Sequence, residues 1–350
     1  MEILGNEDVR ARLLALAEQD KLHHCLLFEG PKGLGKAAAA RWLAMAVNCD
    51  PGPAMFGAPP RPCGQCQSCR TIAEDQHPDV LWVGLDPQRT APIISVRQAR
   101  ELIGKLALRP HSARRRFVVI DPAEAMRPET ANALLKTFEE PPQDTGFILI
   151  CSSAQQLLPT VRSRSHRIRF RPTETQALSA WLMQQDIDEA DWLAHMADGC
   201  PGRALALADG EAAQWRSVRD AMLDALDADL SGRFGYADTL TRAKKGRSEW
   251  TPRVEQVLDV LERMNRDALC ALAGLPEARF YNSDRADVVH LWGQQLQWQG
   301  CQNIAAAIDS ARENLAAFVN GRLAVDALLA QVKAELRAST QRRVGGPALL

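Results

Sequence analysis

Residues 30–37 read GPKGLGKA, and this short stretch decides the predicted fold. It matches the phosphate-loop pattern G-x-x-x-x-G-K-[ST] through Lys36, but Ala37 stands where a hydroxyl should hold Mg²⁺. The apolar run CLLFEG leads into the loop, and the helix-forming segment AAAARWLAMAV follows it. Because strand, glycine-rich turn and helix are the context that the motif requires, we predict a phosphate loop at this position.

Three further apolar runs, residues 80–83, 117–120 and 147–151, are typical of parallel strands that are buried on both faces. Helical patterns separate these runs, and one of them opens with a capping box formed by Ser95 and Gln98. Alternation of strands and helices predicts a doubly wound α/β domain with a parallel sheet.

The pattern changes after this α/β segment, and only helical periodicity follows. We place the α/β core at residues 1–171, with a cysteine-rich insertion at 49–69. A small set of helices then covers residues 172–209, and an all-α domain covers 210–340. The last residues, 341–350, are expected to form a flexible tail.

Composition excludes several classes of function. The 350 residues are 46% hydrophobic and 24% charged, as in a folded globular protein. The net charge of −1 provides no global basic field for autonomous binding to nucleic acid. No apolar run approaches the roughly 20 residues that cross a bilayer, and no signal peptide opens the sequence. We therefore expect a cytoplasmic protein with no membrane partner.

Four of the nine cysteines crowd into one Pro/Gly-rich segment with the spacing C-x13-C-x2-C-x2-C: Cys49, Cys63, Cys66 and Cys69. Four thiolates complete a tetrahedral shell, which leaves no open position for a catalytic water. In a reducing compartment this spacing favours a metal ion over a disulfide, so we predict structural Zn²⁺. Reactive thiols and an iron–sulfur cluster are the alternatives. The other five cysteines are expected to be ordinary buried thiols.

A phosphate-loop enzyme also needs a carboxylate at the end of a neighbouring strand and a glutamate beside it. Asp121 ends an apolar run at the right place, although it equally suits a strand-end cap, and Pro122 follows it. Glu124 is expected to point elsewhere. The remaining groups can still cradle phosphates, so the candidate nucleotide residues are Gly30, Gly33, Gly35, Lys36, Ala37 and Asp121.

Two basic segments could either contact nucleic acid or lie exposed to solvent. Residues 114–116 read RRR, which is more typical of a solvated entry to a strand than of a DNA contact. Arg97, Arg100 and Lys105 fall on one helical segment, where they suit a phosphate backbone and a solvated helix face equally well.

Several longer stretches carry a resemblance to a known family: HHCLLFEGPKGLGK, ANALLKTFEEPP, LPTVRSRSHRIRF and NLAAFVNGRLAVDALLAQV. They resemble the AAA+ clamp-loader subunits of bacterial DNA polymerase III, in particular the delta-prime branch. The resemblance runs from about residue 5 to residue 332. It implies an AAA+ core with a zinc module bound by the four clustered cysteines, a small helical lid and an all-α collar that joins subunits into a ring.

The resemblance also implies a role for Arg164. In the family, the arginine of a Ser-Arg-Cys segment projects into the ATP site of the neighbouring motor subunit, and Arg164 matches it by position. A guanidinium there neutralises charge that develops during phosphoryl transfer. Ser165 replaces the family cysteine, which leaves the local packing open.

Three departures separate this chain from the ATP-hydrolysing tau/gamma branch: Ala37, Pro122, and Gly202 at the position of a lid arginine, with Arg203 shifted by one. The resemblance therefore implies a non-hydrolysing subunit, a stator whose loop can hold ATP or ADP weakly without turnover. Its implied partners are tau/gamma and delta subunits, the sliding clamp and primer–template DNA. It would take part in DNA-directed DNA polymerase activity only within the holoenzyme.

Two other functions are weighed against this one. An autonomous Mg²⁺-dependent ATPase would use Lys36 and Asp121. A nucleic-acid reader would use the zinc module, but the near-neutral charge and the lack of an aromatic-rich basic surface around residues 49–70 oppose it.

Overall fold

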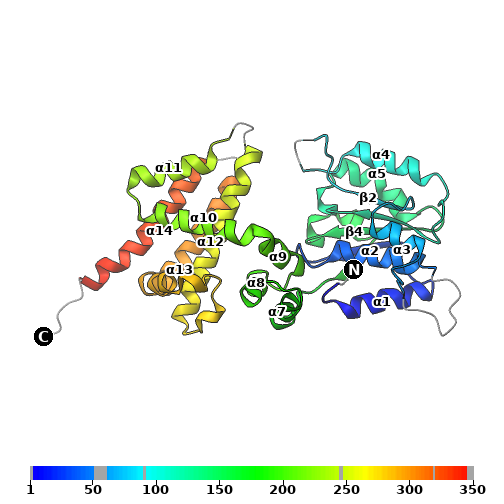
Figure 1. The fold of residues 1–350 in the computed structure, drawn as a ribbon. Coiled ribbons are helices and arrows are strands. Elements are labelled where there is room, and N and C mark those ends of the chain that lie inside the picture. Colours follow the sequence, from blue (N-terminus) through cyan, green and yellow to red (C-terminus); the bar gives the residue numbers. More distant parts are fainter. Residues whose placement is uncertain (1–2, 51–60, 90–91, 244–246, 318–319, 345–350) are drawn as a thin grey trace. The chain divides into compact units, whose positions relative to one another are not determined.

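The computed structural model describes residues 3–50, 61–89, 92–243, 247–317 and 320–344. The chain divides into two compact units, Met1–Leu205 and Ala206–Leu350. Figure 1 shows that the first unit is α/β and the second is helical. Among the described residues, no helix combines the length and the apolar character needed to cross a membrane.

A five-stranded parallel sheet forms the centre of the first unit, with the order β2-β3-β4-β1-β5. The strands are β1 Cys25–Glu29, β2 Val80–Val83, β3 Arg116–Ile120, β4 Thr145–Cys151 and β5 His166–Arg169. The predicted parallel sheet is confirmed. Sequence patterns missed β5, because its alternating charged residues HRIR suit an exposed edge strand rather than a buried run.

Two helical layers cover the two faces of the sheet (Figure 1). Successive side chains of β1 point to opposite faces and pack against different layers. Leu26 and Phe28 pack with helices on one face, whereas Cys25 and Leu27 belong to the core on the other face. The first layer contains α1 Glu7–Glu18, α2 Lys36–Asn48 and α3 Gln67–Ala73, and the second contains α4 Val96–Leu106, α5 Pro128–Glu139 and α6 Pro159–Arg162. Helix α4 begins with the predicted capping box.

Among the described residues after β5, the regular secondary structure is helical. Those that follow the sheet in the first unit are α7 Thr175–Gln184, α8 Ala190–Met196 and α9 Pro201–Ala206. The second unit contains α10 Ala212–Asp227, α11 Leu230–Thr241, α12 Arg247–Leu272, α13 Ala286–Ala316 and α14 Gly321–Val344. Single turns are η1 Ala123–Ala125, η2 Ala154–Gln156, η3 Leu207–Glu211, η4 Glu277–Arg279 and η5 Ser283–Arg285. Helix α14 extends into the predicted tail, of which residues 345–350 lie outside the described part.

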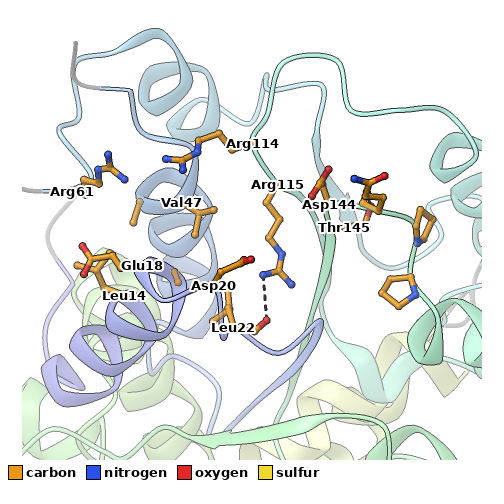
Figure 2. Close-up of a pocket in the computed structure, with 15 residues that line it drawn as sticks. Leu14, Glu18, Asp20, Leu22, Val47, Arg61, Arg114, Arg115, Asp144 and Thr145 are labelled. Atoms are coloured by element: carbon orange, nitrogen blue, oxygen red, sulfur yellow. Dashed lines mark hydrogen bonds between the residues drawn. The ribbon is translucent and has the colours of Figure 1, made fainter. Parts of the chain in front are cut away.

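The edge of the sheet where β3 and β4 begin carries a pocket of about 520 Å³ (Figure 2). Three arginines and three carboxylates line it: Arg61, Arg114, Arg115, Glu18, Asp20 and Asp144. Burial lowers the pKa of Arg115, and the nearby charges of Asp20 and Asp144 oppose that shift. Because the two signs of charge balance, the lining does not select an anionic or a cationic ligand.

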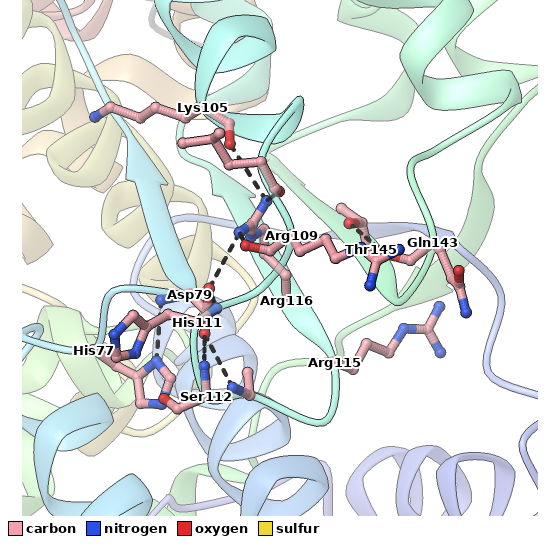
Figure 3. A network of polar contacts seen from close by, with 12 residues as sticks. His77, Asp79, Lys105, Arg109, His111, Ser112, Arg115, Arg116, Gln143 and Thr145 are labelled. Carbon is pink, nitrogen blue, oxygen red and sulfur yellow. Dashed lines mark hydrogen bonds and ion pairs between the residues drawn. The ribbon is translucent and has the colours of Figure 1, made fainter.

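Beside this pocket, a buried ion pair joins the starts of β2 and β3 (Figure 3). The carboxylate of Asp79, whose side chain is 1% exposed, accepts a hydrogen bond from Nη2 of Arg116 at 3.2 Å. It also accepts from three backbone N–H groups, those of His111, Ser112 and Ala113, at 2.8–3.0 Å. The interpretation of residues 114–116 as a solvated segment is therefore wrong for Arg116, which is buried and whose Nη1 and Nη2 donate to the carbonyl oxygens of 108 and 109 and to the buried carboxylate.

Replacement of Asp79 by alanine should destabilise the first unit by about 3–5 kcal/mol, because it leaves the guanidinium of Arg116 buried and unpaired. The matched control is Glu101→Ala, which removes an exposed helical carboxylate paired with Arg97 and should cost about 1 kcal/mol or less. Urea unfolding of the two variants measures the difference. Equal losses for both variants would contradict the role assigned to the buried pair.

The same carboxylate gives stability a defined pH dependence. Burial by itself raises the pKa of Asp79, but the N–H groups of Ser112, His111 and Ala113, followed by Arg116, lower it to about 2. The unfolded state, with an ordinary value of about 3.9, binds the proton first as the pH falls. The stabilisation from Asp79 is therefore complete above about pH 4 and is lost as the pH falls through about 2.

Candidate functional site

The phosphate loop leaves β1 and leads into α2, as predicted. Gly30 has φ 150°, and a Cβ there would meet the carbonyl oxygen of Phe170 at 2.8 Å, so this turn requires glycine. Lys36 is 6% exposed, and its Nζ donates to the carbonyl oxygens of Gly30 at 2.5 Å and Pro31 at 2.7 Å. Burial lowers the pKa of Lys36, while the charge of Asp121 opposes that shift. The lysine is thus held by carbonyls of its own loop.

Two carboxylates lie beside this lysine. Burial raises the pKa of Asp121, the charge of Lys36 lowers it, and the charge of Glu124 raises it further. The charge of Glu124 also raises the pKa of Lys36. The single turn η1, which follows Pro122, brings Glu124 back to this edge, where its Oε1 accepts from the N–H of Ser152 at 3.0 Å. Its Oε2 is buried without a hydrogen-bond partner among the described residues.

Sequence patterns missed the role of Glu29, the last residue of β1. Its Oε1 accepts hydrogen bonds from Nη2 of Arg167 at 2.6 Å and from the N–H of Ala154 at 2.9 Å, and its Oε2 pairs with Nε of the same arginine. The hydrogen bond from Arg167 lowers the pKa of Glu29, and burial opposes it. Glu29 therefore ties the strand that carries the loop to β5. An acidic residue that closes an apolar run was the available signal.

Arg164 lies between α6 and β5, away from the phosphate loop of its own chain. Its side chain is 32% exposed, and its Nε donates to Oε2 of Glu139 on α5 at 3.2 Å. Its Nη1 donates to the carbonyl oxygen of Thr160 at 3.2 Å. Next to it, the hydroxyl of Ser165 donates to the carbonyl oxygen of Val161 at 2.8 Å, so the serine is satisfied where the family has cysteine.

The four clustered cysteines come together as their spacing predicts. Cys49 caps the end of α2, Cys66 caps the start of α3, and the four Sγ atoms all lie within 4.8 Å of one another. A tetrahedral zinc shell with bonds of about 2.3 Å requires sulfurs about 3.8 Å apart, so a small contraction around an ion suffices. Residues 51–60 of the predicted insertion lie outside the described part. The four sulfurs can hold a metal ion.

Backbone N–H groups prepare these sulfurs for that role. The N–H groups of Cys63, Cys66 and Cys69 donate to the Sγ atoms of Cys49, Cys63 and Cys66, each at 3.4 Å. Hydrogen bonds from the N–H groups of Cys66 and Gln65 lower the pKa of Cys63 to about 6. Burial raises the pKa values of Cys49 and Cys69, so the placement of the four sulfurs and the N–H···S bonds, not the pKa values, support a metal centre.

Gly202, which stands at the position of a lid arginine in the tau/gamma branch, contacts the phosphate loop. Gly202 lies in α9, and its N–H donates to the carbonyl oxygen of Gly33 in the phosphate loop at 2.8 Å. The neighbouring Arg203 directs Nη1 toward Oδ2 of Asp198 at 3.1 Å. Of the predicted residues, the structure therefore gathers the loop, Lys36, Asp121 and Gly202 in one place. Arg164 and the cysteine cluster stand apart from that place.

Comparison with known proteins identifies the family. A family model described as "DNA polymerase III, delta subunit" matches residues 5–174. The delta-prime subunit of DNA polymerase III from Bacillus subtilis strain 168 is 30% identical over 314 residues, which cover 87% of this chain and 88% of that protein. The chain belongs to the delta-prime family of DNA polymerase III subunits. The predicted family is thus confirmed.

Two other relatives match the delta-prime-type chain over shorter stretches. The delta-prime subunit from Pseudomonas aeruginosa is 40% identical over 166 residues, 47% of this chain and 48% of that protein. The gamma/tau subunit from Mycobacterium tuberculosis strain H37Rv is 35% identical over 195 residues, 54% of this chain. The delta-prime-type chain spans only 32% of the length of that gamma/tau relative.

Proposed function

We propose that this chain is a non-hydrolysing subunit of the DNA polymerase III clamp loader, where it helps to place the sliding clamp on primed DNA. The observation that carries the proposal is the state of its own phosphate loop. Lys36 is held by loop carbonyls, Ala37 supplies no ligand for Mg²⁺, and Pro122 supplies no base. A loop of this kind can hold ATP or ADP without hydrolysing it.

Arg164 would contribute to hydrolysis at the site of a neighbouring subunit. It is partly exposed in the short segment between α6 and β5, and its ion pair with Glu139 is at the surface. Since exposed pairs contribute about 0–1 kcal/mol, Arg164 can exchange Glu139 for a phosphate at little cost. The partners in this arrangement are tau/gamma and delta subunits, the sliding clamp and primer–template DNA. Polymerase activity belongs to the holoenzyme.

The remaining assignments complete the proposal. The cysteine cluster would hold structural Zn²⁺ in the core, because four thiolates close its shell. The proposed domains are a core at residues 1–171, a lid at 172–209 and a collar for oligomerisation at 210–340.

One observation favours a second candidate, an autonomous ATPase. Glu124 acts on the pKa values of both Lys36 and Asp121, as a displaced base would, but its Oε1 is engaged by the N–H of Ser152. Ala37 remains without a hydroxyl in either case.

The purified chain should hydrolyse ATP no faster than its Lys36→Ala variant, with Mg²⁺ present and with or without primed DNA. Steady-state phosphate release measures the rate. Turnover by the wild type that Lys36→Ala abolishes would establish the second candidate instead. Co-purification of the chain with tau/gamma and delta subunits tests the assembly separately, since a stator must enter the ring whether or not it binds nucleotide.

A further inference from the structure

Two glycines bring the lid and the phosphate loop into direct backbone contact. The N–H of Gly202 belongs to the first turn of α9, where helix geometry leaves N–H groups without partners inside the helix. The carbonyl oxygen of Gly33, in the middle of the loop, accepts from it at 2.8 Å. No ligand atom fits between two backbone segments at that distance.

Residue 202 is glycine because of this contact, not because of its backbone conformation. It adopts no positive φ, so any residue suits its place in α9. A Cβ at this position, however, would lie 3.1 Å from the carbonyl oxygen and 3.2 Å from the Cα of Gly33. On the other side of the contact, a Cβ at Gly33 would lie 2.9 Å from the backbone nitrogen of Arg203. The absence of both side chains is what permits the approach.

Neighbouring residues hold the lid in this position. Cys200, which is 4% exposed, belongs to the same buried cluster as Leu34 of the loop. One residue earlier, the carbonyl oxygen of Gly199 accepts from the N–H of Thr173 at 2.8 Å. The start of α9 is therefore anchored both to the apolar core and to the segment that leaves β5, and the contact does not depend on a single hydrogen bond.

We propose that Gly202 latches the lid onto the phosphate loop, so that a nucleoside diphosphate or triphosphate enters only after the latch opens. A phosphate loop binds its ligand by wrapping backbone N–H groups around it, and the lid backbone rests on the middle of that loop. This latch deepens the proposed function and rests on it, because it limits access of nucleotide to a loop that does not hydrolyse it. It also holds the core and the lid together as one body without a ligand.

The test replaces Gly202 by leucine in the full-length chain, which blocks the contact without adding charge. Gly104→Leu is the matched control, because Gly104 is also helical, adopts no positive φ and has no atom within 4 Å of an added Cβ. Titration with a fluorescent N-methylanthraniloyl-ADP measures nucleotide affinity. Hydrogen–deuterium exchange of residues 30–36 and 199–206 measures opening of the latch.

Gly202→Leu should bind the ADP probe about 10-fold or more tightly than the wild type, because affinity scales with the population of the open state. Exchange of both segments should rise together in this variant, and Gly104→Leu should match the wild type in both measurements. Gly202→Ala, whose methyl group presses on Gly33, should show a smaller gain of about threefold, and it serves if the leucine variant fails to fold.

Equal affinity of the wild type and both Gly202 variants for the probe would overturn the latch, as would fast exchange of the two segments in the wild type. Failure of the latch is distinguishable from failure of the proposed function, because the latter is judged by phosphate release. A Gly202 variant that binds the ADP probe more tightly and still releases no phosphate from ATP supports both the latch and the proposed function. Release by the wild type contradicts the proposed function alone.

Discussion

Arg164→Ala should lower the ATP turnover of a reconstituted clamp loader by about 10³-fold or more, while this chain alone stays inactive. An arginine supplied to a neighbouring site stabilises charge that appears only in the transition state, so its loss acts on kcat more than on KM. In the isolated chain the same side chain bonds to Glu139 on α5, Thr160 on α6 and the hydroxyl of Ser163 just after α6, all at the surface, so its removal should leave stability within about 1 kcal/mol of the wild type.

Two further variants serve as controls: one removes a nearby arginine, and the other changes Arg164 itself conservatively. Arg162→Ala removes an exposed arginine at the end of α6 and should leave turnover unchanged. Arg164→Lys keeps the charge but loses the planar fork, so most of the rate should still be lost. DNA- and clamp-stimulated phosphate release by the assembled loader is the measurement. Full turnover with Arg164→Ala, or an equal loss with Arg162→Ala, would remove Arg164 from the mechanism.

Removal of the metal from the cysteine cluster should have the second large effect. We expect one Zn²⁺ per chain, bound with an apparent affinity in the nanomolar range or tighter at neutral pH. Without it, four sulfurs within 4.8 Å of one another lose the ion that offsets their mutual repulsion as thiolates. The segment from Cys63 to α3 should then unfold locally, while the parallel sheet, which has its own core, persists.

Release of zinc by a chelator, followed with a colorimetric indicator, measures both the stoichiometry and the affinity. Cys66→Ser should abolish tight binding and raise hydrogen exchange in residues 61–73. Cys270→Ser, which changes a partly buried thiol in the second unit, is the control and should retain the ion. Affinity should weaken as the pH falls, because protons compete with the metal for thiolates. A chain isolated without bound metal, with unchanged exchange in Cys66→Ser, would contradict the assignment.

Local patterns were sufficient for much of the fold. The strands β1 to β4 are continuous apolar runs, and the capping box at Ser95 depends on residues three positions apart. The cysteine cluster follows in the same way, because two residues separate Cys63 from Cys66 and Cys66 from Cys69. These features are encoded by spacing along the chain. The family resemblance adds Arg164 by position alone, and no contact with a neighbouring subunit was needed to select it.

Edges and buried polar groups were harder to predict. The strand β5 has no apolar run, because it pairs on one side only and faces solvent elsewhere. Arg116 was expected in solvent because it follows two other arginines, yet it is buried and pairs with a buried carboxylate 37 positions earlier. Local sequence could not reveal such partners, since burial of a charge depends on which distant groups arrive beside it.

By itself, the sequence determined the parallel α/β core, the phosphate loop, the four-cysteine cluster and the family, because each depends on residue types at short spacing. Only the tertiary structure decided which groups meet at the loop. It placed Glu29 against Arg167, set Glu124 against the N–H of Ser152, and set Gly202 against Gly33. The physical reason is that these contacts join segments far apart in the chain, and chain folding, not local periodicity, brings them within hydrogen-bonding distance.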